Sequence, residues 1–209
     1  MRIGPSIAPQ SPSPPFRRII ARTLRALVRV GNGADRPHIP CMSSTSHPQR
    51  DPVGPGQVSV WDFPRPAIAE ATDAHVKIEH AGTLVADSRA TVRTLETSHP
   101  PSYYIPRADI APGILRKAQG SSSCEWKGVA TYWDVVIGDL VLPGVGWSYP
   151  EPTPAFEILR DHVAFYAAPF DRCSVDGATV TPQPGGFYGG WVTEAFAGPF
   201  KGGPGSRWW

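Results

Sequence analysis

The sequence predicts one mainly β domain, an antiparallel sandwich or barrel-like fold with a single short helix. Its 25 prolines and 21 glycines are spread along the whole chain, and proline interrupts helices because it lacks a backbone donor and clashes with the preceding turn. Several short segments alternate polar and apolar residues, as half-buried strands do. Asp176-Gly177 lies between Val175 and Val180, which is a strong signal for a type I′ hairpin turn.

The expected elements follow from these patterns in chain order. Strands are predicted at 75–79, 83–86, 91–96, 102–105, 126–137, 145–149, 162–166 and 172–175, because these stretches are rich in alternating or β-branched and aromatic residues. A short helix is predicted from Asp109 to Lys117, and a loop at 121–123. The stretch from Pro184 to Trp209 is rich in glycine and aromatic residues and shows little periodicity.

The two parts of the chain differ in charge. Residues 1–50 contain eight arginines and one acid, a net charge of +7, whereas residues 51–209 contain 12 basic and 17 acidic groups, a net charge of −5. We therefore expect a disordered or mis-assigned N-terminal extension at 1–56 and the folded domain at 57–209. An acidic domain argues against nucleic acid as a partner, because phosphate binding needs a basic face.

Three interpretations stay open for the first 41 residues. The segment from Phe16 to Val30 has arginines on one helical face and no acids, as expected of a basic amphipathic helix. It is an upstream extension, an organelle transit segment or a membrane-surface helix. The expected location is cytoplasmic, with an organelle as the alternative if 1–41 is a transit segment.

The cysteines predict neither a metal site nor disulfides. Cys41, Cys124 and Cys173 include no C-x-x-C pair, whereas structural zinc usually needs four closely spaced Cys or His ligands. We expect no metal and no cofactor, and a reducing compartment. No apolar run approaches the ~20 residues of a membrane-spanning helix.

Candidate catalytic residues lie at Cys124, Lys127 and Glu96. A cation near Cys124 would favour its thiolate and make it reactive; the alternative is a small buried thiol beside a surface lysine. Glu96 and His99 are three residues apart and could form an acid–base pair. Alternatively, Glu96 pairs with an arginine or accepts backbone donors, or forms a structural ion pair with Lys127.

Candidate ligand-binding residues are Tyr104, Arg107, Trp126 and Lys201. Twelve aromatic residues lie between 126 and 191, and they either line a groove for a planar or sugar-like ligand or simply fill the core. Lys201 begins a glycine-rich loop that could bind phosphate through backbone N–H groups. It lacks the G-x-x-x-x-G-K-[ST] pattern, so a tight structural loop is the alternative.

Six segments occur together in a distinctive order: LETSHPPSYYIPRADI at 95–110, CEWKGVATYW at 124–133, WSYPEP at 147–152, HVAFY at 162–166, VDG at 175–177 and GGFYGGWVTEAFAGPFKGGPG at 185–205. The set resembles the family called domain of unknown function 427, also labelled nucleotidyltransferase, over roughly residues 58–209. The resemblance implies a small β-tent fold, shared with certain zinc proteins and B-type methionine sulfoxide reductases. It implies no known reaction, and the paired cysteines of the zinc members are missing.

Three functions follow as hypotheses. The first is a module that binds an unidentified small polar or planar molecule in an aromatic cleft. The second is an enzyme that uses Cys124 as nucleophile or redox thiol. The third is nucleotide handling, which would need acids converging on a magnesium ion; the sequence shows no D-x-D cluster. Whether the protein is an enzyme, and its oligomeric state, do not follow from the sequence.

Overall fold

The structure is a computed structural model that describes residues 48–209. A seven-stranded sheet forms its largest part. Its strands lie in the order β2 (Ile68–Thr72), β5 (Thr91–Glu96), β6 (His99–Pro106), β10 (His162–Phe165), β9 (Leu140–Ser148), β8 (Gly128–Ile137) and β7 (Leu115–Cys124). All neighbouring strands in it are antiparallel.

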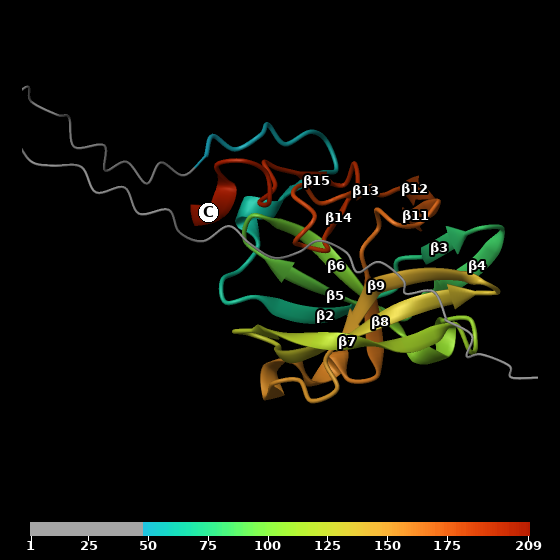
Figure 1. Cartoon of the computed structure of the whole chain (residues 1–209). Helices are drawn as coiled ribbons and strands as arrows, with labels where there is room; N and C mark the ends of the chain where they lie inside the picture. Colours follow the sequence, from blue (N-terminus) through green and yellow to red (C-terminus); the bar gives the residue numbers. More distant parts are fainter. Residues whose placement is uncertain (1–47) are drawn as a thin grey trace, which may run out of the picture. The chain divides into compact units, whose positions relative to one another are not determined.

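A second, four-stranded sheet packs beside it. Its strands lie in the order β12 (Ala178–Thr179), β11 (Arg172–Val175), β3 (Val76–His80) and β4 (Thr83–Ser88). Two short pairs complete the set: β13 (Thr181–Pro182) with β14 (Trp191–Val192), and β1 (Val58–Ser59) with β15 (Phe196–Ala197). In Figure 1, β13–β15 lie at one end of the described part and β7–β9 at the other.

Helical structure is limited to short 3-10 segments in the described residues. These are η1 (Val60–Asp62), η2 (Arg107–Asp109), η3 (Pro154–Leu159) and η4 (Ser206–Trp208). The prediction of a mainly β, antiparallel fold is confirmed. Among residues 48–209, no helix has the length and apolar character needed to cross a membrane.

The predicted position of the short helix was wrong. Between Asp109 and Lys117 the chain ends η2, turns, and enters β7 at Leu115, where Leu115 pairs with Val135. The predicted loop at 121–123 also belongs to β7, because Ser121 to Ser123 pair with Thr131 to Val129. Pairing with β8 therefore overrides the weak local β propensity of this segment.

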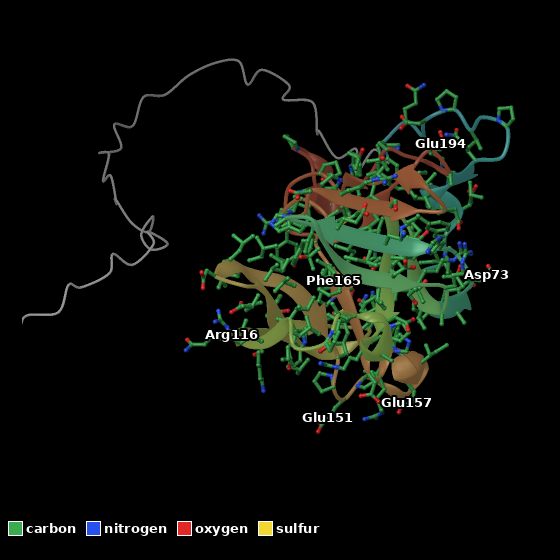
Figure 2. All side chains as sticks on the ribbon, turned by 90° about the vertical axis from the view of Figure 1, so that its right-hand side faces the viewer. Asp73, Arg116, Glu151, Glu157, Phe165 and Glu194 are labelled. Carbon is green, nitrogen blue, oxygen red and sulfur yellow. The ribbon has the colours of Figure 1, made fainter. Side chains whose placement is uncertain are left out.

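The two faces of the seven-stranded sheet bury different residues, because successive side chains of a strand point to opposite sides. On β6, Tyr103 and Ile105 join the cluster between the two sheets, whereas Tyr104 joins a second cluster that η3 covers with Phe156 and Leu159. Figure 2 shows Phe165 of the first cluster in the interior, with Arg116, Glu151 and other charged side chains at the periphery.

The predictions for the N-terminal part of the chain lie partly outside the described residues. The targeting segment and most of the disordered extension predicted at 1–56 fall on 1–47, which lie outside the described residues. Further along, the Asp51 N–H donates to the Gly198 carbonyl at 3.0 Å, and Arg50 pairs with Asp62 at 2.8 Å. The domain boundary near residue 57 stays a prediction.

Candidate functional site

A cleft of about 490 Å³ opens on the face of the seven-stranded sheet that carries Tyr104. Its floor is built by residues two apart on the same strands, which share one face. The floor residues are Thr94 and Glu96 of β5, Ser102 and Tyr104 of β6, and Ala130 and Tyr132 of β8. Loops complete the walls: the turn between β7 and β8, the stretch before β2, the loop between β13 and β14, and the stretch after β15.

The aromatic side chains that form one wall of the cleft are held in place by contacts with one another and with neighbouring hydroxyls. The Trp147 ring lies 4.7 Å from that of Tyr166 and 6.1 Å from that of Tyr104, between centroids. The Trp147 indole N–H donates to the Tyr104 hydroxyl at 3.2 Å. The Tyr132 hydroxyl lies 2.8 Å from that of Ser122. Rings fixed in this way form a preorganised apolar surface with polar atoms at its edge.

Cys124 ends β7 and lies half-buried in the cleft. Burial is the main cause that raises the pKa of the Tyr149 phenol in the same cleft, and interaction with Cys124 raises it further. Cys173 differs because it is buried in the core between the sheets, and burial raises the pKa of its thiol to about 12. Of the two cysteines in residues 48–209, Cys124 is the one that borders the cleft.

Five charged side chains line the same cleft: Arg65, Glu96, Glu125, Lys127 and Lys201. Within residues 48–209 no ion pair joins any of them, although eight ion pairs form elsewhere in that part of the chain. The structural ion pair between Glu96 and Lys127 that the sequence left open is therefore not formed. The Lys201 ammonium donates to the main-chain oxygen of Trp209 at 2.7 Å, and the Lys127 ammonium lies 5.6 Å from the Phe156 ring centroid.

Gln183 fixes the orientation of the His99 ring at the edge of the cleft. The Gly190 N–H donates to the Gln183 Oε1 at 3.0 Å, so Nε2 of that amide is the donor to its other partners. This Nε2 donates to the Lys201 carbonyl at 2.8 Å and lies 3.0 Å from Nδ1 of His99. Nδ1 is therefore the acceptor, and the neutral ring carries its proton on Nε2.

The charge state of His99 follows from its surroundings. Burial is the largest cause that lowers its pKa to about 4, and the positive charges of Lys201, Lys127 and Arg65 lower it further. The ring is therefore neutral at pH 7. Its Nε2–H has no hydrogen-bond partner in the described part of the chain and is available to a bound molecule.

The structure brings together six of the seven site residues that the sequence suggested. Glu96, Tyr104, Cys124, Trp126, Lys127 and Lys201 all line the cleft. Arg107 does not: it lies in η2, with its guanidinium carbon 4.1 Å from the centroid of the Trp133 ring. Sequence reasoning left out Arg65 and Gln183, which reach the cleft from separate loops and carry no local motif.

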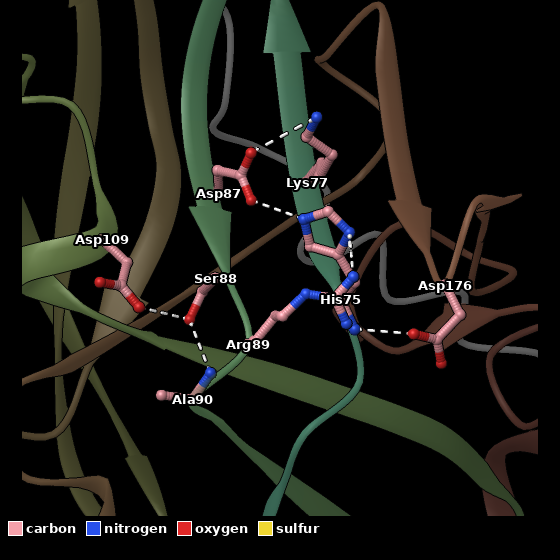
Figure 3. A network of polar contacts seen from close by, with 8 residues as sticks. All are labelled: His75, Lys77, Asp87, Ser88, Arg89, Ala90, Asp109 and Asp176. Carbon is pink, nitrogen blue, oxygen red and sulfur yellow. Dashed lines mark hydrogen bonds and ion pairs between the residues drawn. The ribbon is translucent and has the colours of Figure 1, made fainter.

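A second polar cluster lies away from the cleft, at the start of β3 (Figure 3). His75 Nε2 lies 2.6 Å from Asp87, and Arg89 donates to its Nδ1 at 3.2 Å. Asp176 accepts the His75 backbone N–H at 2.8 Å. These contacts join β4, the segment entering β3 and the β11–β12 turn, so we assign the cluster to holding the smaller sheet together.

Potential metal ligands are scattered in the described residues. No group of three or more His, Cys, Asp or Glu side chains comes together there in a way that could hold a metal ion. The cleft is lined by aromatic rings, hydroxyls, one thiol and charged side chains that form no ion pair in the described part of the chain.

Fold and site together define a β-domain protein with one aromatic-lined cleft. The chain matches the family described as Domain of unknown function (DUF427) over residues 68–176, just over half of its 209 residues, and belongs to that family. The match includes β5 to β8 and the predicted cleft residues from Glu96 to Lys127, but not Lys201. No curated protein matches the chain.

Proposed function

We propose that this protein binds a small molecule with a planar or sugar-like ring in the aromatic-lined cleft. The observation that carries the proposal is the wall formed by Tyr104, Trp147 and Tyr166, whose rings contact one another beside charged groups that form no ion pair within residues 48–209. Functional pockets are typically concave, mostly apolar and supplied with a few placed polar groups.

The dimensions and chemistry of the cleft suit such a ligand. Its volume of about 490 Å³ lies within the roughly 300–1,000 Å³ common for small-molecule sites. Flat aromatic faces stack on flat or partly apolar rings, and the hydroxyls and carboxylates at the edge can orient ring substituents. Tyr104 is 1% exposed and serves as support, whereas Tyr132 and Tyr166 are partly exposed and can contact a ligand.

A thermal-shift screen of the full chain against nucleosides, aromatic amino acids and monosaccharides tests the proposal. A molecule that binds the native state raises the melting temperature by mass action. Tyr166→Ala should then weaken binding of a positive compound at least tenfold, whereas Trp208→Ala should leave it unchanged. Trp208 is 83% exposed and outside the cleft, so it controls for the loss of one aromatic ring. Failure of every compound class, or binding insensitive to Tyr166→Ala, would contradict the proposal.

Thiol chemistry at Cys124 is the second candidate function. It is favoured by the position of this sulfur in the cleft, beside the Tyr149 hydroxyl. Such a function requires that Cys124 react with electrophiles in the folded protein, which alkylation measures. Nucleotide handling is a special case of the first proposal, and nucleotides with and without magnesium in the same screen test it.

A further inference from the structure

The cleft has a cationic end. Arg65 from the stretch before β2, Lys127 from the β7–β8 turn and Lys201 from the stretch after β15 all line it. Their positive charges act together on His99, since each of them lowers the pKa of its ring after the effect of burial. Three segments distant in sequence thus direct cations to one place.

Within residues 48–209 these cations form no ion pair, although Glu96 and Glu125 line the same cleft. Arg65 and Lys127 form no ion pair and no side-chain hydrogen bond within residues 48–209, and Lys201 donates to the main-chain oxygen of Trp209. Burial and the charge of Arg65 lower the pKa of Lys201, although Glu96 and Glu125 oppose this shift. Grouping three cations is unfavourable, two acids offset their charge only in part, and a bound anion would offset it further.

His99 adds a neutral donor to the same place. Gln183 holds Nδ1 as the acceptor, so Nε2–H is the polar hydrogen that the ring can offer to a ligand. A ring that stays neutral at pH 7 donates a directed hydrogen bond. Lysine and arginine beside it supply the charge-assisted hydrogen bonds that carboxylate and phosphate oxygens accept.

We propose that the ligand of this cleft carries an anionic group, a carboxylate or a phosphate, that binds between Arg65, Lys127 and Lys201 beside His99. This inference rests on the proposed function for the location of the ring, but the anion site can be tested alone. The ring of the ligand then lies against Trp147 and Tyr166, and the anion fixes its orientation.

Inorganic pyrophosphate contains no ring, so its binding tests the cationic end of the cleft alone. NMR titration of His99 in the full chain should show that pyrophosphate raises the pKa of this ring, more than sodium chloride of equal ionic strength does. Lys127→Ala should remove the effect of pyrophosphate, whereas Lys117→Ala should retain it, because Lys117 is an exposed cation of β7 outside the cleft. If pyrophosphate and sodium chloride changed the pKa of His99 equally, the inference would be overturned.

Three compounds that share a ring separate this inference from the proposed function. Adenosine 5′-monophosphate and adenosine-5′-carboxylic acid should bind at least tenfold more tightly than adenosine in calorimetric titrations, and the stronger of the two identifies the preferred anion. Adenosine binding as tightly as both would refute the anion site and leave the ring site intact. Pyrophosphate binding without any ring compound would support the anion site and contradict the ring proposal.

Discussion

Gly189 lies directly against the indole of Trp147: a Cβ built on this glycine would come within 2.0 Å of the Trp147 Cη2 atom. The loop between β13 and β14 therefore touches the aromatic wall of the cleft through bare backbone. The neighbouring Gly190 is equally close to Pro100 and Gln183, at 2.7 and 2.3 Å. The loop and the sheet are fitted together in a way that leaves no room for a side chain.

Gly189→Ala should consequently destabilise the domain and distort the cleft. The added methyl would force Trp147 or the loop to move, and overpacking of this kind typically costs about 1–3 kcal/mol. Urea unfolding monitored by tryptophan fluorescence measures the change in the free energy of unfolding. Gly203→Ala is the matched control, because its Cβ would meet only the Pro184 side chain at an ordinary 3.9 Å. Equal stability of the two variants would show that the loop does not pack on Trp147.

The Asp176-Gly177 turn provides a second stability test. Both residues have positive φ, 50° and 83°, and Val175 pairs with Ala178, so the predicted type I′ hairpin is confirmed. Gly177→Val should cost more than ~1 kcal/mol of stability, because a β-branched residue resists this conformation. Thr179→Val exchanges one β-branched residue for another at an exposed position of the adjacent strand and should be nearly neutral. A neutral result for Gly177→Val in denaturant unfolding would contradict the turn geometry.

Local signals explain which parts of the fold the sequence could predict. The hairpin depends on two adjacent residues, and the strands at 91–96 and 162–165 show alternation or β-rich composition, so each could be found from a short window. The strand β7 could not, because its sequence LRKAQGSSSC is largely exposed and has weak β propensity. It forms as an edge strand because β8 supplies its hydrogen-bond partners.

Some residues of the candidate site could likewise be predicted from the sequence, and others could not. Glu96, Cys124 and Lys127 lie at or beside strand ends, where side chains can reach the rim of a sheet, and all three line the cleft. Arg65 and Gln183 come from loops whose positions depend on contacts with residues far away in sequence, such as the Gln183 contact with His99. No spacing or motif in a single sequence reports such contacts.

His99 should give the stability of the domain a defined pH dependence. Its pKa falls from an ordinary 6.5 to about 4 on folding, so the unfolded chain binds more protons between these values. The contribution of His99 to the free energy of unfolding is fully present above pH 6.5. It is lost as the pH falls toward 4, by about 3 kcal/mol at most.

The variant His99→Gln separates this contribution from that of other groups. Unfolding free energies measured from pH 4 to 7 should rise with pH more steeply for the native chain than for His99→Gln. Asp87 and Asp134 have lowered pKa values and therefore contribute below pH 4, outside this window. Parallel curves for the two proteins would show that His99 titrates normally, and would remove the evidence that it is neutral and buried.

Alkylation of Cys124 tests whether the cleft is open to reagents. In the variant Cys41→Ser, iodoacetamide at pH 8 should modify Cys124 in the folded protein, because this thiol borders the cleft. Cys173 should react only after denaturation, since burial both blocks access and raises its thiol pKa to about 12. Mass spectrometry of peptides from the native and unfolded protein identifies which sulfur is labelled.

A ligand of the cleft should slow the labelling of Cys124 in the folded protein but not in an unfolded sample. Modification of Cys173 first, or of neither cysteine over hours, would mean that the cleft is closed to small molecules and would count against both the ligand and the thiol functions.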